Sequence, residues 1–386
     1  MQSRPVALDG RCPWAYRSGL GLSWVRQLER SAVMANDVIR LGIIGMGLNN
    51  MASTFVMLND VEDLRYEITA ICSVPQETVD ECCKEFNVPF GTTDFRELVG
   101  RDDVDVVCVF SPDHLHAEHA VAALEAGKHV VCTKPMVTSV ADAKRLVDLA
   151  GDKGVKFLVG QTMRFDRQFL HAKKLFDDGE LGDLIALESF YLHDMRPIFD
   201  FTPWRLNVPQ DFMYGGCVHS IDVIRAFGGD IDEVQAFSNQ GKMTADYAID
   251  DNFFLNVRFK SGVIGRVAGL YGIVHPPTPM MQFGLFGNKG SLQAEFTDNA
   301  PGEIRVILDK WDPKEAEVMA FEPERDRSAY GHGATVIRYM RHFQDCLDND
   351  LDPSPSVIDG AKSVAVGEAA RESIKTGKVV KVFNEF

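Results

Sequence analysis

"VIRLGIIGMGLNN", residues 38–50, joins an apolar, strand-like run to two closely spaced glycines. Gly45 and Gly47 follow the run directly, where a helix is expected to begin. Glycine lets the backbone turn tightly there and approach a pyrophosphate bound by the amides of the helix N-terminus. This context favours a dinucleotide site over an ordinary strand-to-helix turn, although Asn50 replaces the third glycine of the usual motif. We predict four cofactor contacts in the turn: Gly45, Gly47, Leu48 and Asn49.

Similar apolar runs recur along the chain up to about residue 160. They read VIRLGII, EITAIC, VDVVCVF, HVVCT and KFLVG, and helix-length amphipathic segments separate them. In one such segment the helical i, i+3, i+4, i+7 spacing is occupied by Ala117, Ala120, Val121 and Leu124, and Gly127 is placed to end the helix. Strands that alternate with helices are typical of a parallel, doubly wound sheet.

A strand-like alternation dominates after residue 160, and residues 252–259 illustrate it. The apolar set is predicted to face the core: Phe253, Leu255, Val257 and Phe259. The polar set is predicted to face the other way: Asn252, Asn256 and Arg258. The pattern predicts a mostly antiparallel sheet with one packed face and one open face. The open face must meet either water or another subunit, and we favour a second copy of the chain, in a homodimer or homotetramer.

The two patterns predict an α/β protein with two domains, which suits a length of 386 residues. Residues 37–160 are expected to form a doubly wound, dinucleotide-binding Rossmann domain. Residues 161–386 are expected to form an α+β domain for substrate binding and oligomerisation, with a large, mostly antiparallel, open-faced sheet and a C-terminal part that can pack back on the Rossmann domain. Residues 1–36 contain five arginines, no lysine and a second methionine at Met34, and we interpret them as a disordered leader or a non-native start.

Composition excludes several classes of partner. With 56 acidic and 40 basic residues, the net charge of −16 repels nucleic acid. No apolar run is long enough to span a bilayer, so a membrane partner is not expected. The eight cysteines form no C-x-x-C pair, which favours reduced thiols in a cytoplasmic protein. No cluster of cysteine, histidine and carboxylate suggests a metal site.

The second apolar run ends in Cys72 and Ser73, where an acid normally binds the adenosine ribose of the cofactor. No carboxylate is present at this point to repel a 2′-phosphate, and no arginine follows directly to attract one. NAD and NADP are therefore both compatible with the sequence. Ser73 is a candidate cofactor contact, and the alternative is that it begins a turn before Pro75.

A lysine, Lys134, follows the fourth apolar run and precedes Pro135. The end of a parallel strand is where ligands bind in open α/β sheets. A partly desolvated lysine there favours its neutral form and suits proton transfer at neutral pH, while proline fixes the backbone that follows. The alternative is a strand-end lysine that extends into solvent.

These segments resemble the Gfo/Idh/MocA (glucose-fructose oxidoreductase / inositol dehydrogenase) family of NAD(P)-dependent oxidoreductases, over residues 38–383. The matching motifs are GIIGMG (42–47), SPDHLHAEHA (111–120) and TKP (133–135), with GQTMRF (160–165) after the last strand of the domain. The resemblance implies that Lys134 is the catalytic lysine, with Thr133 in place of the family's usual glutamate. It also implies a cofactor cleft with further contacts from Ser111, Pro112, His116, Thr133, Lys134 and Gln161.

The family's second hallmark, an aspartate followed by a histidine and another aspartate, corresponds to GGCVHSIDVIRAF at 215–227. His219 and Asp222 match its last two members, and their i, i+3 spacing predicts one helical face. His219 is implied to be catalytic with Lys134. The first aspartate is absent because Gly215 stands at its position. We expect Asp222 or Asp194 to supply the missing carboxylate.

Polar and aromatic residues are also concentrated in FYLHDMRPIFDFTPWRL, at 190–206. A polyhydroxylated substrate needs several hydrogen-bonding groups and an aromatic face, so the block suits a sugar or cyclitol. Its arginines are equally compatible with a carboxylate, sulfate or phosphate on the substrate. For Asp194 taken alone, a surface ion pair is the alternative. The predicted substrate contacts are Arg164, His193, Asp194, Arg196, Trp204, Arg205 and Asp222.

The leading hypothesis is a dehydrogenase that moves hydride between NAD or NADP and a secondary carbinol carbon of a sugar, glycoside or cyclitol. Lys134 and His219 would exchange the hydroxyl proton. Two alternatives remain. One is a glycosidase that oxidises its sugar transiently with a retained NAD, and the other is a regulatory protein that binds NAD(P) without turnover.

Overall fold

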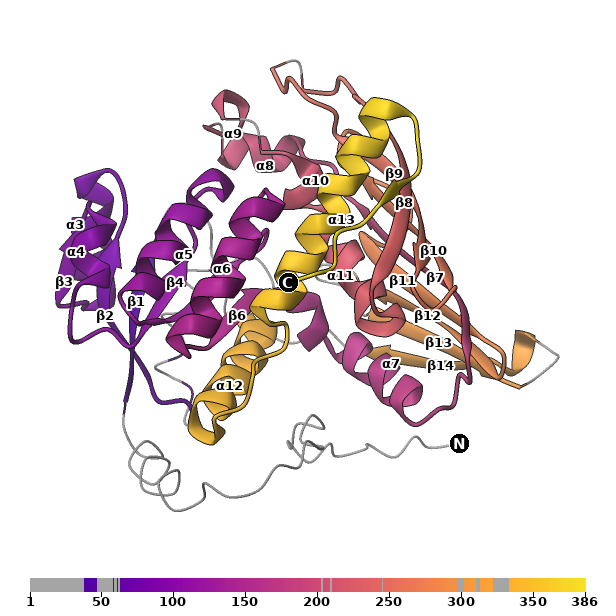
Figure 1. Ribbon diagram of the computed structural model, residues 1–386, viewed down its shortest axis with the longest axis horizontal. Coiled ribbons are helices and arrows are strands. Elements are labelled where there is room, and N and C mark those ends of the chain that lie inside the picture. Colours follow the sequence, from indigo (N-terminus) through magenta and orange to yellow (C-terminus); the bar gives the residue numbers. More distant parts are fainter. Residues whose placement is uncertain are drawn as a thin grey trace.

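The computed structural model describes residues 38–46, 58, 61, 63–202, 204–208, 210–244, 246–296, 302–309, 313–321 and 333–386. Within them the chain forms two sheets, and helix α13 (Val357–Thr376) lies between them (Figure 1). None of the helices in these ranges combines the length and the apolar character needed to cross a bilayer. The expected leader, 1–36, lies outside the described residues.

The first sheet has six strands in the order β3-β2-β1-β4-β5-β6, and every neighbouring pair is parallel. The strands are β1 (Ile39–Ile44), β2 (Tyr66–Cys72), β3 (Phe90–Thr92), β4 (Val106–Val109), β5 (His129–Thr133) and β6 (Phe157–Gly160). The predicted doubly wound sheet is confirmed. Its strand order reverses between β1 and β4, and ligands bind at the carboxyl edge of such a switch point.

Helices cover both faces of this sheet (Figure 1). They are α3 (Gln76–Phe86), α4 (Phe95–Val99), α5 (His116–Glu125), α6 (Val140–Lys153) and α12 (Gly333–Asn349). Helices α5 and α6 share one apolar core with the sheet, while α12 buries Tyr339 and Phe343 in a second core with Leu41 and Ile43 of β1. Gly127 follows α5 with φ +71, as a glycine that ends a helix should. A helix from the last quarter of the chain thus completes the nucleotide-binding half.

The second sheet has nine strands in the order β14-β13-β12-β11-β7-β10-β9-β8-β15. The strands are β7 (Leu184–Leu192), β8 (Ile231–Asn239), β9 (Asn252–Phe259), β10 (Ile264–Leu270), β11 (Met281–Gly287), β12 (Gly290–Phe296), β13 (Gly302–Leu308), β14 (Glu317–Phe321) and β15 (Val380–Lys381). Only β7 and β10 pair in parallel, so the prediction of a mostly antiparallel sheet is confirmed for the described strands.

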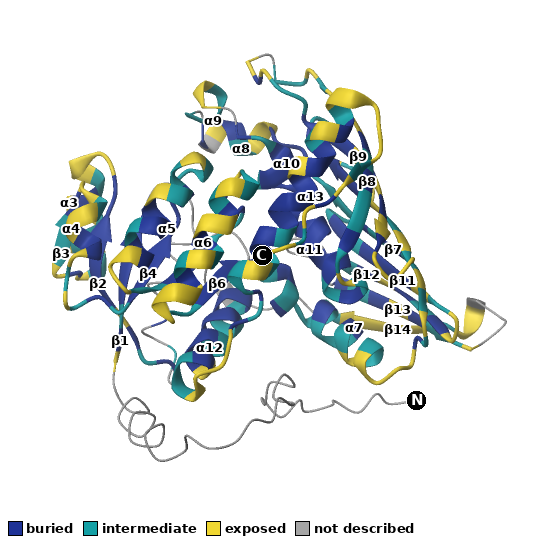
Figure 2. Ribbon diagram, viewed as in Figure 1, coloured by how far each residue is buried: buried dark blue, intermediate teal, exposed yellow. Residues whose placement is uncertain are grey.

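Helices pack on one face of the second sheet and leave the other open. The helices of this half are α7 (Arg167–Asp177), α8 (Arg196–Phe201), α9 (Trp204–Asn207), α10 (Phe212–Gly215), α11 (Cys217–Gly228) and α13, with short turns η2 (Asp113–Leu115), η3 (Thr162–Phe165) and η4 (Pro313–Glu315) elsewhere in the chain. Helix α11 contacts β7 and β10, and α13 contacts β8. Figure 2 shows buried residues on this side and exposed ones on the outer side of the strands.

The alternation predicted for β9 is confirmed for its apolar side chains, which are all buried from Phe253 to Phe259 at every second position. Asn252 is a correction. It was expected on the open face, but it is buried, and its amide nitrogen donates to Asn239 Oδ1 (3.1 Å) and Asp251 Oδ1 (2.9 Å). These acceptors satisfy the buried amide, so the first residue of the strand can be buried at a position where the alternation predicts exposure.

Candidate active site

The carboxyl edge of the first sheet begins with Gly45, whose φ of +100 lies in the region that favours glycine. A Cβ at this position would lie 2.6 Å from the Phe110 carbonyl carbon and the Ser111 nitrogen, so only glycine lets the ends of β1 and β4 approach so closely. The next amide, Met46 N, donates to Ser73 Oγ (3.2 Å). Ser73 thus supports the turn from inside, and its predicted cofactor contact stays a prediction. Gly47, Leu48 and Asn49 lie outside the described residues.

The turn after β4 is fixed by two histidines of α5. The His116 ring nitrogens lie 2.7 Å from Pro135 O and 2.6 Å from Ser111 O, and the ring is fully buried. His119 Nδ1 lies 2.8 Å from Ser111 Oγ. His116 thus links the turn after β4 to the turn after β5, and its predicted place in the cofactor cleft stays a prediction. Pro112 is partly exposed at this edge.

Lys134 crosses from the first sheet to the second half of the chain. It follows β5, and its Nζ donates to the backbone oxygen of Gly215 at the end of α10 (2.7 Å). Burial lowers the pKa of Lys134 to about 8, with the positive charge of Arg205 acting in the same direction and the carboxylate of Asp113 opposing it. An amine with this pKa is partly neutral near pH 7, so it can both accept and donate a proton.

Gln161 follows β6 beside Lys134, because Thr133 and Gly160 are register partners on β5 and β6. Its side chain is buried, and neither its amide oxygen nor its amide nitrogen has a hydrogen-bond partner among the described residues. A buried amide without partners is costly unless a ligand completes it. Gln161 and the tight glycine turn at Gly45 therefore fit a dinucleotide whose polar groups reach this edge.

His219 lies on α11, and its backbone N donates to Gly216 O (3.1 Å), next to the residue that binds Lys134. Its ring centroid lies 5.9 Å from that of Tyr191 on β7, and Tyr191 in turn lies 6.0 Å from the ring of His193. The two predicted histidines are thus brought together by a tyrosine. Sequence reasoning missed Tyr191, although it lies in the block at 190–206 from which His193 was chosen.

The i, i+3 spacing predicted that Asp222 and His219 share one face of the helix, but the two side chains have different neighbours. Arg164 holds its carboxylate through two bonds, Nε to Oδ2 (2.7 Å) and Nη2 to Oδ1 (2.6 Å). Arg164 also reaches Ser354 Oγ (3.2 Å) and Asp359 Oδ1 (3.3 Å). Burial opposes the charged form of Arg164, but the carboxylates of Asp222 and Asp359 outweigh it and raise the pKa of Arg164, so the guanidinium stays charged. Arg164 and Asp222 thus form a buried ion pair between η3 and α11, and their predicted contact with a substrate stays a prediction.

Asp194 and Arg196 also pair with each other. Arg196 Nε and N donate to Asp194 Oδ1 (2.9 and 3.2 Å), and these bonds lower the pKa of Asp194 to about 2. The ion-pair alternative for Asp194 is therefore the better description. Asp222 and Asp194 were the two candidates for the missing carboxylate. Among the described residues, neither of them accepts a hydrogen bond from Lys134, whose Nζ donates to Gly215 O.

Arg205 begins a polar chain that the sequence did not suggest. Its Nη1 donates to the Gln210 side-chain oxygen, and Gln210 Nε2 donates to Asp113 Oδ1 (2.6 Å). The guanidinium lies over the ring of Trp204, 5.0 Å from its centroid. Arg205 Nε is buried and has no partner among the described residues, so this donor is available to a ligand. Burial lowers the pKa of Arg205, with Asp113 opposing.

At one edge of the first sheet the site therefore combines a lysine of lowered pKa, a histidine of the adjoining turn, a buried arginine donor, and a buried amide without partners among the described residues. Such groups can hold a polyol, orient its hydroxyls and exchange a proton with it. Within the ranges that the structure describes, no three histidine, cysteine or carboxylate side chains are grouped as metal ligands would be.

Comparisons with known proteins agree with this geometry. Residues 39–161 match the oxidoreductase family with an NAD-binding Rossmann fold, and residues 169–293 match the Gfo/Idh/MocA C-terminal domain. The chain is 26% identical to myo-inositol 2-dehydrogenase of Thermotoga maritima, over 89% of this chain and 98% of that protein. It is 32% identical to scyllo-inositol 2-dehydrogenase (NADP(+)) of Bacillus subtilis, over 89% and 96%.

A solved structure of levoglucosan dehydrogenase in complex with NADH and levoglucosan matches with a TM-score of 0.78. It covers 90% of this chain and 100% of that one at 22% identity, which supports the same fold. The resemblance stated from the motifs and the predicted NAD(P) cofactor are confirmed. The chain belongs to the Gfo/Idh/MocA family of NAD(P)-dependent oxidoreductases.

Proposed function

We propose that the protein transfers hydride between nicotinamide and a secondary alcohol or ketone of a sugar, glycoside or cyclitol. The observation that carries the proposal is Lys134, whose Nζ lies between the two halves of the chain with a pKa of about 8. Relatives named for myo-inositol, scyllo-inositol and levoglucosan support a polyol substrate.

The residues at the sheet edge would have different roles in such a reaction. The turn at Gly45, with Ser111, Pro112, Thr133 and Gln161, would hold the cofactor, which supplies hydride acceptance and donation when bound. Neutral Lys134 removes the hydroxyl proton during oxidation, and the ammonium returns it during reduction. His219, at the adjoining turn, is the second group placed to exchange this proton.

The buried donors would orient the substrate. Arg205 Nε is a buried donor with no acceptor among the described residues, so a hydroxyl oxygen of a polyol could accept its hydrogen. His193 and Tyr191 lie beside His219 and add further hydrogen-bonding groups. Arg205, His193 and His219 are therefore the proposed substrate contacts, with the Trp204 ring beside Arg205.

A screen tests the proposal: inositols, sugars and glycosides are incubated with NAD and with NADP, and absorbance of the reduced cofactor is followed. Steady formation of reduced cofactor with at least one polyol is expected. Aglycone release from a glycoside without net reduction would instead indicate a glycosidase that retains NAD. Cofactor binding without turnover of any compound would indicate a regulatory protein.

The pH dependence of the reaction should follow Lys134. Because the neutral amine is the base, kcat/KM for polyol oxidation is expected to rise through about pH 8 and then level off. In the reduction direction, which needs the ammonium, kcat/KM should fall over the same interval. Initial rates in both directions between about pH 6 and pH 10 check this. A level profile through pH 8 in both directions would exclude Lys134 as the proton-exchanging group.

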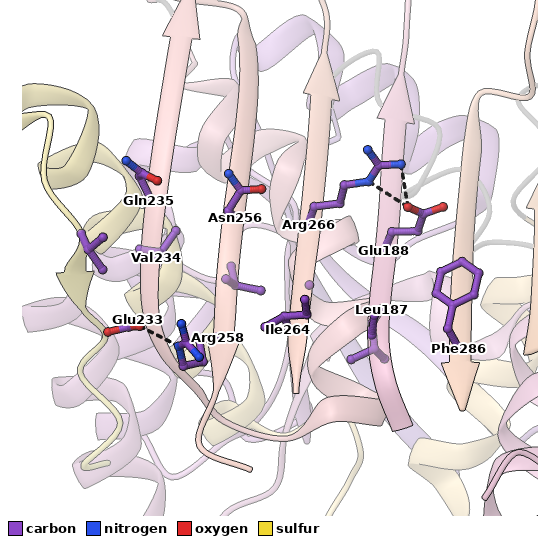
Figure 3. Close-up of a pocket in the computed structure, with 14 residues that line it drawn as sticks. Leu187, Glu188, Glu233, Val234, Gln235, Asn256, Arg258, Ile264, Arg266 and Phe286 are labelled. Atoms are coloured by element: carbon purple, nitrogen blue, oxygen red, sulfur yellow. Dashed lines mark hydrogen bonds and ion pairs between the residues drawn. The ribbon is translucent and has the colours of Figure 1, made fainter. Parts of the chain in front are cut away.

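We also propose that the open face of the second sheet binds a second copy of the chain. Figure 3 shows side chains of neighbouring strands on this face, including the ion pairs Arg258–Glu233 and Arg266–Glu188. Large apolar side chains are exposed among the strands: Ile185, Phe237, Phe254, Ile264 and Phe286. Paired charges leave little net repulsion, and an exposed apolar patch of this kind suits a two-fold, self-complementary contact.

Phe254→Glu should weaken that contact. Phe254 is 57% exposed and pairs directly with Phe237 across β8 and β9, so the change places a charge beside another exposed aromatic ring of the open face. Self-association measured by sedimentation is expected to weaken by about tenfold to a hundredfold. Leu351→Glu, an exposed apolar position between α12 and α13, is the matched control and should leave association unchanged. A wild-type protein that is monomeric at micromolar concentration would rule out the proposed contact.

A further inference from the structure

A carboxylate lies next to the position that a side chain would take at Gly215, the last residue of α10. A Cβ built on Gly215 would have one neighbour within 4 Å among the described residues, Asp113 Oδ2 at 3.5 Å. Asp113 belongs to η2, the short turn after β4, so this carboxylate reaches position 215 from the other half of the molecule. The space left by the glycine is thus bordered by an acid.

Lys134 reaches the same peptide from the neighbouring strand. Its Nζ donates to Gly215 O (2.7 Å), so the ammonium and the Asp113 carboxylate both lie at Gly215. The charged groups that act on Lys134 are Asp113 on η2 and Arg205 on α9, with His219 of α11 at the adjoining turn. Asp113 is the negative charge among them.

The orientation of the carboxylate is fixed by its other oxygen. Gln210 Nε2 donates to Asp113 Oδ1 (2.6 Å), and Arg205 holds the Gln210 side-chain oxygen. Gln210 is itself held because Tyr247 OH donates to its backbone oxygen (2.6 Å). With Oδ1 engaged in this way, Oδ2 is the oxygen that faces Gly215. Arg205, Gln210 and Asp113 thus form a hydrogen-bonded chain that directs Asp113 Oδ2 toward Gly215, the residue whose backbone oxygen binds Lys134.

We propose that Asp113 is the positioning residue for Lys134, and that it supplies from η2 the carboxylate that position 215 lacks. The inference rests on the proposed oxidoreductase function and adds a residue to it. During oxidation the substrate hydroxyl would lose its proton to the Lys134 amine, and a bound oxidised nicotinamide would accept the hydride from the same carbon. The charge of the Asp113 carboxylate stabilises the ammonium that forms.

Three variants test the assignment: Asp113→Asn, Gly215→Asp and the double variant. Asp113→Asn keeps the shape and removes the charge, so the Lys134 ammonium loses stabilisation. The rising limb of kcat/KM against pH should move to lower pH by on the order of one unit, and kcat should fall by about tenfold to a hundredfold. The double variant returns a carboxylate to the same space from the other side, so both values should recover in part.

Gly215→Asp alone places two carboxylates together and should move the limb to higher pH. Position 215 does not have the positive φ that would exclude a side chain, so the backbone tolerates the change. Asp102→Asn, on an exposed loop, is the matched control and should leave the profile unchanged. NADH binding and thermal unfolding, measured on every variant, identify any that do not fold.

A direct titration separates this inference from the proposed function. In protein labelled with ¹⁵N-lysine, the Lys134 Nζ signal, assigned by its absence in Lys134→Arg, reports the pKa without any substrate. A lower pKa of Lys134 in Asp113→Asn, with recovery in the double variant, supports the inference. If the protein shows this titration but oxidises no polyol, the proposed function is overturned and the inference stands. An unchanged Lys134 titration in Asp113→Asn, or no recovery in the double variant, overturns the inference whatever the turnover.

Discussion

Lys134→Ala is expected to lower kcat for polyol oxidation by about 100- to 10,000-fold, which is the range that one positioned acid–base group contributes. The cause is chemical: the variant lacks the amine that accepts the hydroxyl proton, and Gly215 O loses its donor. Cofactor binding should persist, because the turn at Gly45 and the Gln161 amide are unchanged. Stopped-flow measurement of reduced-cofactor formation, with NADH binding followed by fluorescence, separates the two effects.

Two controls make the result specific. Lys144→Ala removes an exposed lysine on α6 that pairs with Asp148, and kcat should stay near the wild-type value. A small primary amine added to Lys134→Ala should restore part of the rate, because it can occupy the space of the lost ammonium and exchange the proton. A variant that kept most of its kcat would show that another group is the base.

Local patterns were enough to predict both sheets. A period of 3.6 residues in the helices and 2 in the strands is written in consecutive residues, and burial on one face imposes it. Gly45 was also predictable, because a glycine directly after a strand is required where two strand ends approach within contact distance. These features depend on neighbours in sequence, or on a close approach that only one residue type allows.

The pairing of the charged residues was not predictable in the same way. Asp113 and Gln210 are 97 residues apart, and Arg164 and Asp222 are 58 apart, so nothing local indicates that either pair meets. The spacing of His219 and Asp222 placed both on one side of α11. That helix is enclosed by β7 on one flank and by η3 on another, so neighbouring positions of one stripe meet different partners.

These pairings have one physical basis. A charge at or near the protein interior is stabilised by a partner, and the atoms that bond to the partner are less available to a ligand. Arg164, Asp222, Asp194 and Arg196 looked like substrate contacts because they are polar and lie near the motifs. The structure gives each a partner within the protein, whereas the Arg205 Nε donor and the Gln161 amide, buried without partners among the described residues, keep their capacity for a ligand.

Asp222→Ala is expected to lower the free energy of unfolding by about 3–5 kcal/mol, because it leaves the Arg164 guanidinium buried beside only part of its countercharge. Asp222 is 1% exposed and accepts two of the Arg164 bonds, while Asp359 accepts a longer one at 3.3 Å. Against a total stability on the order of 5–15 kcal/mol, this loss is large. Urea unfolding followed by tryptophan fluorescence measures it.

The same variants decide between a structural pair and a substrate contact. Replacing both partners, in Arg164→Met with Asp222→Leu, should recover most of the stability, since no unpaired charge remains from the pair. Asp232→Ala, which breaks the exposed pair with Lys381, is the control and should cost less than about 1 kcal/mol. Folded Asp222→Ala protein should keep its KM for the polyol within about threefold, because a carboxylate held by Arg164 does not reach the substrate. A rise in KM of tenfold or more with unchanged stability would instead make Asp222 a substrate contact, as the helical spacing first indicated.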